Sequence, residues 1–284
     1  MGLSRRGVML GLSCVAAGGP ALAQDDIDDF QGLERKYGGR LGVFVHDTGS
    51  DRSQSYREDE HFLMCSTFKV LAVADVLARV DAGREQLDRR IPYGQKDLLD
   101  YAPVTRAHLK DGGMVLGALC AAAIHVSDNT AANLILSALG GPAEVTRFAR
   151  SLGDDYTRLD RTEPTLNDPG GELDTTTPRA MSRSVGKILL GQVLKPASRD
   201  RLEKWMQEET PGLGRVRRGL PSTWTAADKP GTGDTQTNDV VLARRPDGKS
   251  PLMIAAYYEN PKGNSVQAQA VMQAIGRIVG RWAT

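Results

Sequence analysis

The sequence lacks any long apolar run beyond its first residues, and it has no excess of charge of one sign. No run after residue 23 reaches the ~18 apolar residues that a membrane-spanning helix needs, so we expect no membrane span. Its 36 lysines and arginines nearly balance 35 acidic residues, a chain without the electrostatic footprint of a nucleic-acid-binding protein. With 284 residues, 40% of them hydrophobic, the composition predicts a soluble protein with one or two cores.

Cysteine is scarce too, and only Cys65 and Cys120 lie outside the N-terminal segment. In an oxidising compartment two cysteines either form a disulfide or remain free, and sequence alone does not show whether their Cα atoms approach closely enough to pair. We favour two buried free thiols, because cysteine commonly behaves as a small buried hydrophobe.

The first 23 residues have the pattern of a signal peptide. The basic stretch Ser4-Arg5-Arg6-Gly7 precedes an apolar segment at 8–17 and a small-x-small cleavage site ending at Ala23. Adjacent arginines indicate twin-arginine export, although they also occur in ordinary secretory signals. We therefore expect an exported protein that is cleaved near Ala23, and its mature chain has a net charge of −1 because two arginines are removed.

Hydrophobic periodicity predicts strands near both ends of the chain and helices between them. A hairpin over 41–57 follows a short helix at 25–37, and a buried helix begins at Ser66 and stops at Gly83. Distant strands around a helical middle suggest one sheet with a helical block inserted into it. The other expected helices cover 116–126, 130–139, 142–152, 179–194, 199–208 and 266–282, and the other strands cover 224–229, 239–244 and 252–258.

Four stretches carry chemistry. Ser66-Thr67-Phe68-Lys69 places a hydroxyl and an amine one helical turn apart, where a lysine can help to deprotonate a serine nucleophile. By itself this spacing also fits a capped surface helix. Each of the others has an equally plain alternative: a helix N-cap for Ser127-Asp128-Asn129, a solvated loop for the stretch from Glu163 to Asn167, and a simple turn for Lys229-Pro-Gly-Thr232.

Together, and in this order, the four stretches resemble the motifs of the class A serine β-lactamases. The resemblance covers essentially all of residues 24–284, with an Ω loop at about 161–176. It implies an α/β fold of the serine β-lactamase and penicillin-binding transpeptidase type, an antiparallel sheet flanked by helices plus an all-helical domain. The α/β domain would then be discontinuous, from 24–63 and 211–284, and the helical domain would span 64–210. A periplasmic monomer that acts on small β-lactams without metal or cofactor is expected.

The resemblance also implies catalytic roles. Ser66 would attack the lactam carbonyl and form an acyl-enzyme, which a water activated by Glu163 would hydrolyse. Lys69 and Glu163 would manage the serine proton, and which of them is the acylation base stays open. Ser127, helped by Lys229, would pass a proton to the departing lactam nitrogen.

Substrate binding is implied for a further group of residues. Backbone N–H groups of Ser66 and Thr232 would form the oxyanion hole. Asn129 would bind the side-chain amide of the substrate, Asn167 would help to hold the hydrolytic water, and Tyr101 would stand at the mouth of the cleft. An ion pair between Arg161 and Asp174 would close the Ω loop.

The chain departs from the family pattern at Pro230, where threonine or serine is usual. This change removes a hydroxyl expected to bind the substrate carboxylate, an interaction of about 1.5–3 kcal/mol. We expect Arg215 to take over part of this role, because it occupies the place from which some relatives send an arginine into the cleft, while Asn238 stands where others carry theirs. The Ω loop is also shorter than usual, with six residues between Asn167 and Asp174.

Neither disulfide known in the family is expected, since the partner positions of Cys65 and Cys120 are Gly233 and Val73. Two rivals to a β-lactamase remain at this stage. A D-Ala-D-Ala peptidase shares the serine motifs but lacks the glutamate found here at 163, and a β-lactam-binding sensor would be acylated without turnover.

Overall fold

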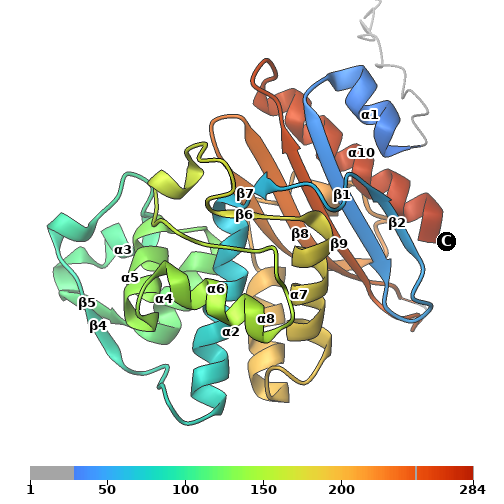
Figure 1. The fold of residues 1–284 in the computed structure, drawn as a ribbon. Helices are drawn as coiled ribbons and strands as arrows, with labels where there is room; N and C mark the ends of the chain where they lie inside the picture. The colour runs from blue at the N-terminus through green and yellow to red at the C-terminus, as the bar shows by residue number, and fades with distance from the viewer. Residues whose placement is uncertain (1–28, 247, 284) are drawn as a thin grey trace, which may run out of the picture.

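A five-stranded antiparallel sheet runs through the molecule, with helices on both faces (Figure 1). The computed structural model describes residues 29–246 and 248–283, so the expected signal peptide lies outside the described residues. Strand order is β2-β1-β9-β8-β7, which joins segments from both ends of the chain and confirms the expected fold class. The strands are β1 (Arg40–Asp47), β2 (Ser53–Tyr56), β7 (Thr225–Thr232), β8 (Gln236–Arg244) and β9 (Leu252–Glu259).

Helices α1 (Phe30–Tyr37) and α10 (Ser265–Ala283) cover one face of the sheet. Alternate strand residues such as Val43, Val45 and Ile254 pack with Ile275 and Val279 of α10 in one apolar core. Strands β1, β8 and β9 are almost entirely buried because both faces of the sheet are covered. Among the described residues, no helix combines the length and the apolar character that a membrane crossing requires.

The opposite face of the sheet packs on the helical block, whose centre is α2 (Phe68–Asp81). Every residue of α2 from Phe68 to Leu77 is buried, so this helix is enclosed on all sides. Full burial of a large apolar side chain stabilises a fold by ~1.5–3 kcal/mol, and this helix therefore holds the residues near its start firmly in place. The surrounding helices are α4 (Leu116–His125), α5 (Asn129–Leu139), α6 (Pro142–Ser151), α7 (Pro178–Leu190) and α8 (Pro196–Gln207).

Several expected element boundaries were wrong. Helix α2 begins at Phe68 rather than at Ser66, which lies in a one-turn 3₁₀ segment, Cys65–Thr67. Strand β7 extends to Thr232, and strand β8 begins at Gln236. The Lys229–Thr232 stretch therefore lies within β7 and does not follow it. Pairing continues past Pro230 because β7 is the edge strand of the sheet, where a missing N–H is tolerated.

The remaining elements are short. They are β3 (Phe62–Leu63), β4 (Arg90–Pro92), β5 (Gly113–Val115), β6 (Thr175–Thr176), α3 (Pro103–Ala107) and α9 (Val216–Gly219), with further 3₁₀ turns at Gln95–Asp97, Leu109–Asp111 and Thr165–Asn167. Both described cysteines are buried free thiols, as expected. Burial raises the pKa of the Cys65 thiol and of the Cys120 thiol.

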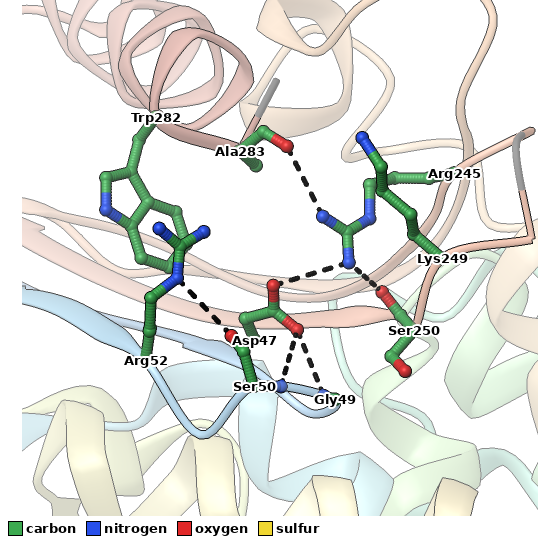
Figure 2. A pocket seen from close by; sticks show the side chains of 9 residues that line it. All are labelled: Asp47, Gly49, Ser50, Arg52, Arg245, Lys249, Ser250, Trp282 and Ala283. Carbon is green, nitrogen blue, oxygen red and sulfur yellow. Dashed lines mark hydrogen bonds and ion pairs between the residues drawn. The ribbon is translucent and has the colours of Figure 1, made fainter.

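At the far end of the sheet, Arg245 joins three segments beside an open pocket of about 440 Å³ (Figure 2). Its guanidinium donates to the carbonyls of Ser250 and Ala283 and pairs with Asp47, whose Oδ2 is 3.4 Å away. The Arg245 side chain is only 5% exposed. These contacts tie the end of α10 to the turns that follow β1 and β8.

Replacement of Arg245 with methionine is expected to lower the free energy of unfolding by about 1.5–3 kcal/mol, the usual range for hydrogen bonds to a charged group. Urea denaturation measures this change. An unchanged unfolding midpoint would show that the three contacts contribute nothing.

Candidate active site

A cleft of about 450 Å³ lies where the edge strand β7 meets the helical block. It brings together residues from all four motif stretches and from two further segments, at 101 and at 211–215, and Lys69 and Lys229 lie buried beneath its surface. The cleft is lined by Ser66, Tyr101, Ser127, Asn129, Glu163, Asn167, Pro211, Arg215, Pro230 and Thr232.

Ser66 and Lys69 meet on one carboxylate oxygen. The Ser66 hydroxyl donates to Oε1 of Glu163 at 3.3 Å, and the Lys69 ammonium lies 3.1 Å from the same oxygen. Lys69 also donates to the Asn129 side-chain oxygen at 2.7 Å and to the Ser127 carbonyl at 2.8 Å. Burial lowers the pKa of Lys69, although Glu163 opposes that shift. A proton can therefore leave Ser66 directly to the carboxylate or move within this small polar cluster.

In the turn between α4 and α5, one side chain caps a helix and another lines the cleft. Asp128 caps α5 by accepting from the Ala131 N–H at 2.8 Å, so the N-cap interpretation was right for this residue. Ser127 has a φ of 59°, a strained value for a residue with a side chain, and its hydroxyl lies between two ammonium groups. Lys69 Nζ is 3.2 Å from that oxygen and Lys229 Nζ is 3.1 Å from it.

Lys229 is fully buried in β7. Burial, together with the neighbouring Lys69 ammonium, lowers the pKa of Lys229 to about 7. Its amine donates to the Ser127 hydroxyl and to the Pro230 carbonyl. Near neutral pH both the protonated and the neutral forms of Lys229 are therefore populated, and the protonated form can donate to the Ser127 hydroxyl.

Glu163 is held on the Ω loop by partners on both its backbone and its side chain. The Asn133 side chain accepts from the Glu163 N–H at 2.9 Å and donates to its carbonyl at 2.8 Å. Asn167 donates to Oε2 of Glu163 at 2.8 Å, while the buried Asn167 Oδ1 has no hydrogen-bond partner among the described residues. Asn133 was not predicted from the sequence, although it follows Asn129 by one turn of α5 and shares its face.

An ion pair closes the Ω loop. Arg161 Nε donates to Asp174 Oδ2 at 2.5 Å, which confirms the expected pairing. The other Asp174 oxygen accepts backbone N–H groups of Asp160 and Arg161, both at 2.8 Å, and the carboxylate is fully buried. The loop that carries Glu163 is therefore fixed at its base.

Arg215 lies behind Thr232 at the β7 side of the cleft. One terminal nitrogen donates to the Thr232 hydroxyl at 2.6 Å, and the other donates to the carbonyls of Gly231 and Asn238. The guanidinium has no acceptor atom, so the Thr232 oxygen must accept, and its own hydrogen is left to donate to a different group. Arg215 is 8% exposed and lines the cleft, as does Tyr101, which is 51% exposed.

The Beta-lactamase enzyme family model matches residues 24–283. The chain belongs to this family. It is 41% identical to β-lactamase CTX-M-8 of Citrobacter amalonaticus over 91% of this chain and 89% of that protein. Identity to β-lactamase OXY-2 of Klebsiella oxytoca is 43%, over 87% of this chain and 86% of the relative.

Solved structures agree with this assignment. A β-lactamase from Burkholderia vietnamiensis has a TM-score of 0.88 and 50% identity, covering 89% of this chain and 94% of that one. An ancestral class A β-lactamase has a TM-score of 0.85 and 51% identity, with 88% and 96% covered. This β-lactamase is therefore a class A hydrolase that opens the β-lactam amide bond through a serine acyl-enzyme.

Proposed function

We propose that Ser66 is the nucleophile, and the observation that supports this best is the shared contact of its hydroxyl and the Lys69 ammonium with Glu163. The Ser66 oxygen bonds to the lactam carbonyl carbon while its proton passes to Glu163 or Lys69. Backbone N–H groups of Ser66 and Thr232 stabilise the oxyanion. The ring C–N bond then breaks, and the nitrogen takes a proton from Ser127, which Lys229 replenishes.

Deacylation uses the other side of the carboxylate. Glu163 takes a proton from a water molecule as that water attacks the ester carbon, and the Ser66 oxygen leaves and regains a proton. Asn167 supports this step because its unpartnered Oδ1 is available to accept a hydrogen bond from the same water. Without an aimed base the ester would persist, since general-base assistance contributes about 10²–10⁴ in rate.

Substrate binding follows from the remaining cleft residues. Asn129 binds the side-chain amide of the substrate, and Tyr101 borders the mouth of the cleft. The Thr232 hydroxyl, which accepts from Arg215, donates to the substrate carboxylate. Arg215 adds a buried positive charge behind this contact, and together they replace the hydroxyl that Pro230 lacks.

Arg215→Ala is expected to raise the Michaelis constant for a penicillin by about 10–200-fold, because a charge-assisted contact of ~1.5–3 kcal/mol is lost. Steady-state kinetics on the variant measure this effect. Arg218→Ala is the matched control, since Arg218 lies on the neighbouring helix α9 but is exposed. Equal constants for the Arg215 variant and the parent protein would remove Arg215 from carboxylate binding.

Ser66 is tested by intact-mass spectrometry of the protein after brief mixing with a penicillin. The adduct should have the mass of the intact drug, map to the peptide that contains Ser66, and be absent from Ser66→Ala. An adduct on another residue would overturn the assignment.

We further propose that the protein is exported to the periplasm as a monomer, with cleavage near Ala23, and that it confers resistance there. N-terminal sequencing of the mature protein and its mass in solution test these points. Two domains, 24–63 with 211–284 and 64–210, are proposed to meet at the cleft.

A further inference from the structure

Asn238 stands on β8 directly opposite Gly231 of β7, close to the cleft but not lining it. Its side chain is 1% exposed, and its Nδ2 donates to the carbonyl of Leu63 at 2.9 Å and to that of Met64 at 3.2 Å. Both partners accept hydrogen bonds only, so the amide nitrogen must face them. The side chain is therefore turned toward the backbone that leads into Ser66.

That backbone is unusual. Cys65, between Met64 and Ser66, has a φ of 46°, a left-handed value that is uncommon for a residue with a side chain. The Met64 carbonyl also accepts from the Thr67 N–H at 3.2 Å and from the Thr67 hydroxyl at 2.8 Å. The Met64 carbonyl, just before Ser66, therefore bonds to Thr67 on the other side of the nucleophile and to Asn238 on strand β8 of the sheet.

Asn238 also contacts strand β7, which carries the second donor of the proposed oxyanion hole. Asn238 pairs with Gly231, the residue before Thr232, and its own carbonyl accepts from Arg215 at 2.6 Å. Gly231 packs so closely on Met64 that a Cβ atom on Gly231 would lie 2.7 Å from the Met64 carbonyl oxygen. Asn238 therefore contacts both backbone segments whose N–H groups form the proposed oxyanion hole.

We propose that Asn238 is a positioning residue that sets the distance between the Ser66 N–H and the Thr232 N–H. This inference rests on the proposed oxyanion hole. Donors in such a hole act only when they point at the place where the oxyanion forms, and a displacement of about an ångström weakens them strongly.

Asn238→Ala in a Glu163→Gln background tests the proposal, because the acyl-enzyme then persists long enough for infrared spectroscopy. We expect the ester carbonyl band to move to higher wavenumber and to broaden, since weaker oxyanion-hole bonds polarise the carbonyl less. With Glu163 intact, Asn238→Ala should slow acylation by about tenfold, a fraction of the 10²–10³ effect of losing a donor outright. The dissociation constant for the unreacted drug should change less than twofold.

Asn260→Ala is the matched control. The Asn260 side chain also donates to a backbone carbonyl, that of Tyr37 at 3.0 Å, and it follows β9 at a place outside the cleft lining. This control should leave the carbonyl band and the acylation rate unchanged even where it lowers the melting temperature. Asn238→Leu, which keeps the branched shape and the number of heavy atoms but has no donor, should reproduce the alanine result and serves if the alanine variant does not fold.

A parent-like band and parent-like acylation in both Asn238 variants would overturn the inference. That outcome differs from failure of the proposed function, in which the Glu163→Gln background itself would form no adduct on Ser66.

Discussion

Replacing Glu163 with glutamine is expected to stop catalysis after one acylation, so that the protein accumulates as a stable ester on Ser66. The amide keeps the size of the side chain and can still accept a hydrogen bond, but it cannot take a proton from water. Deacylation should fall by about 10²–10⁴, the usual contribution of a general base. Stopped-flow kinetics with a chromogenic cephalosporin should show one stoichiometric burst in place of steady turnover.

Glu203→Gln is the control for that experiment. Like Glu163, Glu203 pairs with a cationic side chain, that of Arg244 at 2.6 Å, but it lies on α8 outside the cleft. It should turn over at the parent rate. Sustained parent-like turnover by the Glu163 variant would mean that a different group activates the hydrolytic water.

Lys69→Met is expected to slow acylation by about 10²–10⁴, the second large effect. The Lys69 ammonium joins Ser127, Asn129 and Glu163, so its loss removes a proton carrier and leaves a buried carboxylate without its cation. Pre-steady-state acylation rates measure the change. Lys187→Met is the control, because Lys187 likewise donates to a backbone carbonyl, that of Leu152, away from the cleft lining.

The two variants together address the acylation base. If Glu163→Gln acylates at the parent rate while Lys69→Met does not, Lys69 alone can remove the Ser66 proton. If both acylate slowly, the proton leaves through the oxygen that they share. Parent-like acylation by Lys69→Met would exclude the lysine from this step.

Local patterns in the sequence predicted most of the fold. The periodicity from Ser66 to Gly83 identified the buried helix, and alternation identified the hairpin and three late strands, because burial of one face imposes these spacings. The exact helix start was missed, since a single 3₁₀ turn and the left-handed Cys65 leave no periodic signal. The last residues of β7 and the first residues of β8 were missed because Pro230 and the polar residues that follow it resemble a turn.

The site was predicted by the order of four motifs and not by any of them alone. The contacts that hold the site residues in place could not be predicted, because they depend on how segments distant in the sequence approach one another. Asn133 hydrogen-bonds to both the backbone N–H and the carbonyl of Glu163, and Asn238 hydrogen-bonds to the carbonyls before Ser66. No pattern in the sequence around either asparagine indicates these contacts. The placement of Arg215 behind Thr232 likewise required the structure.

The central claim is that Ser66 is acylated and that Glu163 then directs water to release it. The most direct test is the product formed per mole of purified protein mixed with excess chromogenic cephalosporin. Steady release of many equivalents, lost in Ser66→Ala and reduced to one equivalent in Glu163→Gln, is the predicted result. A single equivalent from the unaltered protein, or undiminished release by Ser66→Ala, would contradict the account.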